Sequence, residues 1–92
     1  MSKVTVTKFY AEWCQSCKLV SVILKKLKED YKPEQVQFVD MNIDENKKLF
    51  DDMNIVTLPT VIISSEGKES ETITGAKPRA VYASLIDKFL SD

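Results

Sequence analysis

The sequence predicts an α/β fold in which helices alternate with the strands of one mixed sheet. Short runs of β-branched and aromatic residues alternate along the chain with segments whose apolar residues recur at helical spacing. The leading strand, helix and strand form a βαβ unit, which requires parallel strands and a right-handed crossover. The last two strands are joined by a short turn and should pair antiparallel. The predicted order is therefore βαβαββα.

The first half of the chain supplies a strand, a long helix and a second strand. Residues 4–10 combine alternating valines with two aromatic residues, which is typical of a strand. From Cys14 to Tyr31, apolar residues recur at i, i+3, i+4, i+7 and i+11 and form one stripe of a helix. Lysines in its last turn suit the helix dipole. Val36 to Met41 then predicts the second strand.

A short helix is expected after the second strand. Asp44 has the side chain of a helix N-cap, and we expect the helix to run through Met53. Leu49, Phe50 and Met53 would form its inner face, because they lie three and four residues apart.

The last part of the chain predicts a hairpin and a closing helix. Thr60 to Ser64 is a continuous strand-forming run, and Glu66-Gly67 turns the chain into a further strand from Lys68 to Thr74. Pro78 fits the first turn of the closing helix. Its apolar residues recur in helical pairs and are Val81, Tyr82, Leu85, Ile86, Phe89 and Leu90.

Length and charge limit the functions that this chain can have. Its 92 residues predict a single domain over residues 1–92, since a second unit would lack a core of its own. A net charge of −1 argues against nucleic acid and membrane surfaces as partners. With no histidine and two cysteines, the chain has neither a catalytic imidazole nor four sulfur and nitrogen ligands for structural zinc. The chemistry left open is thiol chemistry, carboxylate chemistry or none, and we expect no metal or organic cofactor to be needed.

The chain shows no secretion signal at Met1-Ser2-Lys3 and no apolar run long enough for a bilayer. We therefore expect a cytoplasmic protein, and separately we expect it to be a monomer. In the cytosol a cysteine pair is kept reduced and is usually catalytic or metal-binding.

The sharpest motif is the pair Cys14 and Cys17, spaced C-x-x-C at the start of a helix that follows a strand. Two intervening residues allow the sulfurs to join or part with little backbone movement. The N–H groups and the dipole at a helix N-terminus favour the thiolate of Cys14, whereas Cys17 lies one turn inside the helix. Position thus predicts that Cys14 attacks and Cys17 resolves the mixed disulfide.

The segment from Phe9 to Lys18, with Leu58-Pro59-Thr60 downstream, resembles the thioredoxin family. Asn42-Ile43-Asp44 and Gly75-Ala76 match further along, so the resemblance covers nearly the whole chain. It implies a minimal thioredoxin-like βαβαββα fold, with a mixed four-stranded sheet and helices on both faces. It also implies a cis Pro59 that faces the disulfide, and an apolar docking rim for a substrate chain made of Trp13, Leu58, Pro59, Gly75 and Ala76.

The clearest departure from the family concerns Lys8 and Asp40. Lys8 stands where thioredoxins have a buried aspartate, and Asp40 where they have a buried lysine. If both are in the core, they should form an ion pair, because neither charge is tolerated there alone. Such a pair would serve as an auxiliary to the cysteines. The alternative is that Lys8 simply reaches solvent at the sheet margin.

The sequence thus favours a dithiol–disulfide oxidoreductase, an electron carrier in cell redox homeostasis that reduces disulfide-bearing proteins and is recharged by a thioredoxin-reductase-like or other dithiol donor. Three alternatives stay open. They are a glutaredoxin-like electron donor, a non-catalytic binding subunit with the thioredoxin fold, and an iron–sulfur cluster shared by two subunits.

Overall fold

The computed structural model describes residues 3–55, 57–66 and 70–91. Its elements follow the predicted order and are β1 (Val4–Tyr10), α1 (Gln15–Lys28), β2 (Val36–Asn42), α2 (Lys47–Asp52), β3 (Thr60–Ser65), β4 (Ser70–Thr74) and α3 (Arg79–Ser91). Gly67 and Lys68, which the sequence places in the turn and at the start of the fourth strand, lie outside the described residues. No helix in the described ranges is long and apolar enough to cross a membrane.

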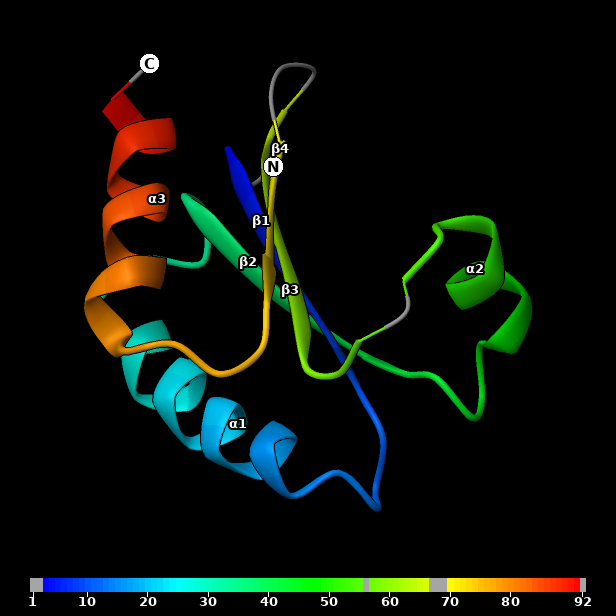
Figure 1. The fold of residues 1–92 in the computed structure, drawn as a ribbon. Coiled ribbons are helices and arrows are strands. Elements are labelled where there is room, and N and C mark those ends of the chain that lie inside the picture. Colours follow the sequence, from blue (N-terminus) through cyan, green and yellow to red (C-terminus); the bar gives the residue numbers. More distant parts are fainter. Residues whose placement is uncertain (1–2, 56, 67–69, 92) are drawn as a thin grey trace.

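The four strands form one mixed sheet in the order β2-β1-β3-β4. β1 pairs in parallel with β2 and antiparallel with β3, and β3 pairs antiparallel with β4. Figure 1 shows α1 and α3 on one face of the sheet and α2 on the other. The predicted fold class, with helices on both faces, is confirmed.

The core lies between the sheet and the two helices α1 and α3. Every second residue of β1 enters it, since strand side chains alternate between the two faces. Tyr82, Ile86 and Phe89 of α3 are fully buried there, against Val20, Leu24 and Leu27 of α1 and valines of β1, β2 and β3. Burial of a side chain of this size contributes about 1.5 to 3 kcal/mol, so this cluster dominates the stability of the fold.

The prediction that Asp44 caps the second helix is wrong. α2 begins at Lys47, with Asn46 as the N-cap residue and no side-chain capping bond. Asp44 instead lies in a turn, where its backbone N–H donates to Asn42 Oδ1 at 2.8 Å. The Asn46 amide donates to the Asn42 carbonyl at 2.9 Å. These local bonds occupy the residues before the helix and delay its start.

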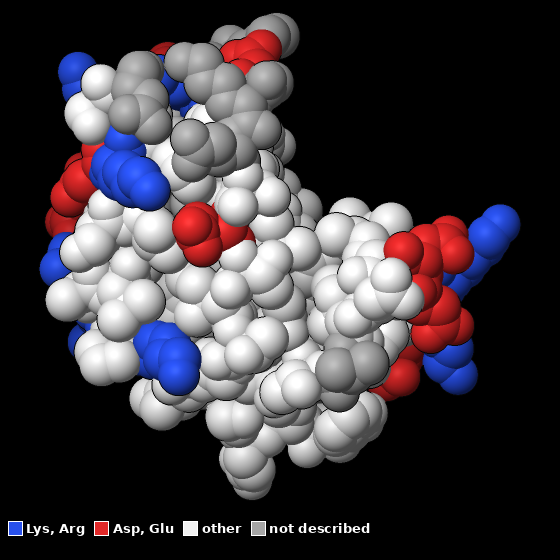
Figure 2. Space-filling view, turned by 45° about the horizontal axis from the view of Figure 1, so that its top comes forward, with Lys and Arg blue, Asp and Glu red and all other residues white. Residues whose placement is uncertain are grey.

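The expected inner face of α2 is also weaker than predicted. Leu49 and Met53 are 37% and 40% exposed, and Phe50 is half-buried. None of the six residues of α2 is buried. Figure 2 shows charged side chains gathered on the outer side of this helix and an uncharged surface beside it. The sheet face towards α2 is rich in hydroxyl side chains, such as Thr5 and Thr7, which tolerate partial exposure to water.

The residues that follow α1 are tied to α3 by polar contacts. The Tyr31 hydroxyl donates to Asp87 Oδ1 at 2.8 Å, and Arg79 forms an ion pair with Asp30. Burial, followed by the hydrogen bond to Asp87 and its negative charge, raises the pKa of Tyr31 to about 12. The folded state therefore holds the Tyr31 proton more tightly than the unfolded chain does.

This shift predicts how stability depends on alkaline pH. A raised pKa in the folded state contributes stability that is fully present below the ordinary tyrosine value of about 10 and is lost as the pH rises through the folded value. We expect Asp87→Asn to lower the pKa of Tyr31, because the amide still accepts the hydrogen bond but carries no charge. Ultraviolet titration of tyrosinate in both proteins measures this, and an unchanged titration would contradict the assignment to Asp87.

A lysine occupies the core side of the central strand β1. Lys8 is the cross-strand partner of Asp40, and its Nζ lies 3.4 Å from Asp40 Oδ1. The predicted pairing is confirmed. The Lys8 side chain is 8% exposed, so the alternative in which it reaches solvent is wrong. The Asp40 side chain is 65% exposed because β2 is an edge strand, so the pair is not buried on both sides.

This asymmetry changes the expected effect of breaking the pair. Asp40→Asn removes a carboxylate that water already screens, so we expect it to change the free energy of unfolding by less than about 1 kcal/mol. A buried partner would instead cost about 3 to 5 kcal/mol. Urea denaturation measures the difference, with Asp52→Asn on α2 as the control for an exposed carboxylate. A loss of several kcal/mol for Asp40→Asn alone would show that the pair behaves as buried.

Candidate active site

The connection between β1 and α1 places Cys14 at the start of the helix. The chain leaves β1 through a tight turn in which the Cys14 backbone N–H donates to the Ala11 carbonyl at 3.1 Å. Cys14 has an extended backbone conformation and is the N-cap residue of α1. Its Sγ accepts the backbone N–H of Cys17 at 3.2 Å. A sulfur therefore takes the place of the usual hydroxyl or carboxylate cap.

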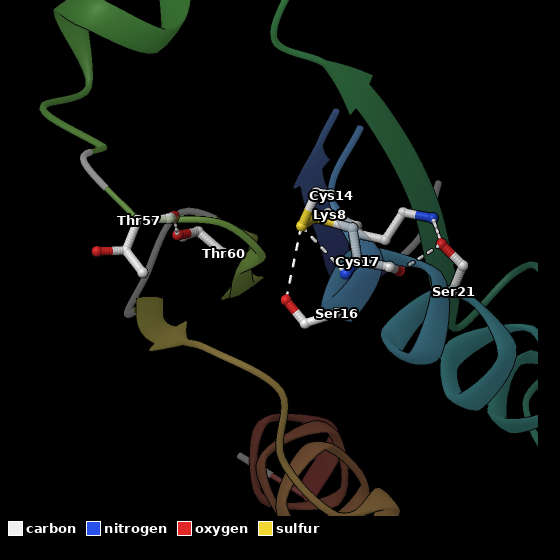
Figure 3. The surroundings of a disulfide bond; sticks show 7 residues. All are labelled: Lys8, Cys14, Ser16, Cys17, Ser21, Thr57 and Thr60. Carbon is white, nitrogen blue, oxygen red and sulfur yellow. Dashed lines mark hydrogen bonds between the residues drawn. A yellow bond between two sulfur atoms is a disulfide. The ribbon is translucent and has the colours of Figure 1, made fainter. Parts of the chain in front are cut away.

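Cys14 and Cys17 are joined by a disulfide, with Cα atoms 5.3 Å apart. Their surroundings differ. Cys14 is 7% exposed and Cys17 1%. Ser16 Oγ lies 3.6 Å from Cys14 Sγ (Figure 3). The C-x-x-C spacing thus produces the redox-active pair expected from the sequence, with Cys14 the more exposed of the two residues.

An apolar collar surrounds the two cysteines. Ala11 is buried with them, and Tyr10, Ile43 and Leu58 pack against this cluster. Leu58 reaches the cluster from the loop that precedes β3. The Ile43 N–H also donates to the Tyr10 carbonyl at 2.9 Å and holds the carboxyl ends of β1 and β2 together.

The loop before β3 is held to the end of β4. The Leu58–Pro59 peptide bond is cis, as the family resemblance implies. The Pro59 carbonyl accepts the backbone N–H of Gly75 at 2.8 Å. Gly75 has φ of 78°, which lies in the left-handed region that favours glycine. The Thr60 hydroxyl donates to the Thr57 carbonyl and tightens the same loop (Figure 3).

The predicted site residues lie at different depths. Leu58 packs against the cysteine cluster, and Pro59 is buried and hydrogen-bonded to Gly75. Trp13, next to Cys14 in the chain, is 68% exposed, and Ala76 is exposed as well. The outermost predicted residues are therefore free to contact another chain.

Lys8 reaches the helix that carries the cysteines. Its Nζ donates to Ser21 Oγ at 2.5 Å, and Ser21 Oγ donates to the Cys17 carbonyl at 2.9 Å (Figure 3). Sequence reasoning missed Ser21. Its place four residues after Cys17, on the same side of the helix, was the available signal.

In the described part of the chain, no group of three or more histidine, cysteine, aspartate or glutamate side chains is placed to hold a metal ion. What the site offers is a pair of cysteines at a helix N-terminus, here joined as a disulfide. Such a pair can exchange two electrons with another dithiol or disulfide.

The chain is similar to known thioredoxins over nearly its whole length. The Thioredoxin family model matches residues 1–88. Thioredoxin 1 of Synechococcus elongatus is 33% identical over 82 residues, which are 89% of this chain and 76% of the relative. The thioredoxin of Listeria monocytogenes is 31% identical over 85 residues, which are 92% of this chain and 82% of the relative.

Solved structures agree with the sequence matches. The crystal structure of chloroplastic thioredoxin z superposes with a TM-score of 0.89 at 26% identity, covering 98% of this chain and 80% of that one. The family match and the Cys14–Cys17 disulfide lead to the same conclusion about the activity. The chain belongs to the thioredoxin family and is a thioredoxin-like dithiol–disulfide oxidoreductase.

Proposed function

We propose that Cys14 is the attacking thiol and Cys17 the resolving thiol in the reduction of protein disulfides. The Cys14 thiolate attacks one sulfur of the substrate disulfide, forms a mixed disulfide and releases the other sulfur as a thiolate. The Cys17 thiolate then attacks Cys14 Sγ, so the second substrate sulfur leaves as a thiolate. Two electrons pass to the substrate, and the Cys14–Cys17 disulfide forms.

The different positions of the two sulfurs support these roles. Cys14 Sγ lies at the N-terminal end of α1 and accepts a backbone N–H, which stabilises negative charge on the sulfur. Cys17 is 1% exposed and one turn inside the helix, so an incoming disulfide reaches Cys14 first. Once the mixed disulfide has formed, Cys17 is the nearest thiol.

The substrate chain is proposed to dock on a rim made of Trp13, Leu58, Pro59, Gly75 and Ala76. The exposed indole of Trp13 offers apolar surface beside Cys14. The loop that carries Leu58 supplies the opposite side, and its position is supported by the hydrogen bond between Pro59 and Gly75. An extended peptide is the substrate form that suits such a rim.

Thioredoxins act on disulfide-bearing proteins and are reduced by partners of the thioredoxin-reductase type. For this chain we propose the same direction of electron flow, with recharging by such a reductase or another dithiol donor. A cytoplasmic location and a monomeric state belong to this proposal. A binding subunit that does not use its cysteines is the competing function.

An insulin-reduction assay with dithiothreitol separates the two functions. We expect the wild-type protein to accelerate the precipitation of insulin, and Cys14→Ser to remove the acceleration because the attacking sulfur is gone. Circular dichroism of both proteins controls for folding. Precipitation at the uncatalysed rate with folded wild type would contradict the proposed function and favour the binding subunit.

A further inference from the structure

The buried cation Lys8 is connected to the resolving cysteine through one hydroxyl. The single proton of Ser21 Oγ points to the Cys17 carbonyl, so the oxygen of Ser21 is left to accept from Lys8 Nζ. The direction of the chain is therefore fixed, from the Lys8 ammonium to the Ser21 hydroxyl and on to the Cys17 carbonyl. The ammonium lies within two hydrogen bonds of the Cys17 backbone.

A second contact of Lys8, with Tyr10, also lies on the cysteine side of the core. Its Nζ lies 4.9 Å from the centroid of the Tyr10 ring, a distance at which a cation is attracted to the ring face. Tyr10 in turn packs against the cluster of Ala11, Cys14 and Cys17. Asp40, whose Oδ1 lies 3.4 Å from the same ammonium, contacts it from the solvent side, since its side chain is 65% exposed.

Ser21 lies between two pockets, each of about 230 Å³. One pocket holds the Lys8–Asp40 pair, the other holds Cys17, and Ser21 lines both. The remaining charged groups that line them are Glu12 and Lys18 beside Cys17, and Lys25 and Lys28 beside Lys8. These four are exposed, so water screens them, whereas Lys8 is buried and acts through a medium of low dielectric.

We propose that Ser21 is a positioning residue, which holds the Lys8 ammonium beneath the first turns of α1 so that its positive charge stabilises the thiolates of the reduced pair. Reduction of the disulfide takes two electrons and up to two protons, one fewer for each sulfur that stays a thiolate. A cation that favours thiolates therefore stabilises the reduced form and makes the reduction potential less negative.

Glutathione redox buffers test this proposal. We expect Lys8→Met and Ser21→Ala each to raise the equilibrium constant for forming the protein disulfide about fivefold. For a two-electron couple this corresponds to a reduction potential about 20 mV more negative. The double variant should match Lys8→Met alone, because Ser21 acts only through Lys8. Ser21→Thr keeps the hydroxyl and should stay within about twofold of wild type, as should Ser84→Ala on the exposed side of α3.

A second readout follows the thiol of Cys17 alone. In a Cys14→Ser background, the ultraviolet absorbance of the Cys17 thiolate should develop at higher pH once Lys8→Met or Ser21→Ala is added. Equal equilibrium constants for wild type and Ser21→Ala, or shifts that add in the double variant, would overturn the positioning role. Alanine is a better helix former than serine, so Ser21→Ala is expected to fold.

This inference rests on the proposed function only in requiring the Cys14–Cys17 couple, and the two fail separately. Glutathione equilibration needs no protein substrate. Shifted potentials in a protein that does not reduce insulin would overturn the proposed function and leave the role of Ser21 intact. Full insulin reduction with unshifted potentials would support the proposed function and overturn the role of Ser21.

Discussion

The tight turn between β1 and α1 is the constraint on which the rest of the site depends. It brings the N-terminus of α1 to the carboxyl edge of the sheet and makes Cys14 both the N-cap of the helix and one half of the disulfide. The hydrogen bond from the Cys17 N–H to Cys14 Sγ and the S–S bond close the same turn of helix. Cys14 is therefore the more exposed of the two residues, and negative charge on its sulfur is stabilised by a backbone N–H, whereas Cys17 lies further inside.

The second feature of the chain is a buried cation on the central strand beneath this turn. The sheet order places β1 between β2 and β3, and the Lys8 side chain is buried on the core side of this strand. Its ammonium contacts Ser21 on α1, the ring of Tyr10 and a carboxylate on the edge strand. Two of these contacts lie on the cysteine side, and the third leads to solvent. The site therefore combines the cysteine pair with a buried positive charge.

Much of this arrangement was predictable from the sequence, because strand and helix periodicities differ and the cysteines follow a strand directly. The start of α2 was not. A search for capping residues selects Asp44, whereas local hydrogen bonds of Asn42 and Asn46 precede the helix, which begins at Lys47. Ser21 was missed because a serine inside a helix is unremarkable by itself, and its partner Lys8 lies on the preceding strand. The exposure of Asp40 depends on strand order, which periodicity does not reveal.

The central claim is that the helix N-terminus separates an attacking thiol from a resolving thiol. Trapping of the mixed disulfide tests it most directly. Incubated with a disulfide-bearing protein, Cys17→Ser should accumulate a covalent adduct through Cys14 that dithiothreitol releases, because nothing resolves it. Cys14→Ser should accumulate little, since Cys17 is only 1% exposed and lies one turn inside the helix, whereas Cys14 is 7% exposed and lies at its start. Mass spectrometry identifies the linked cysteine. Equal adducts from both variants, or an adduct mainly through Cys17, would contradict the account.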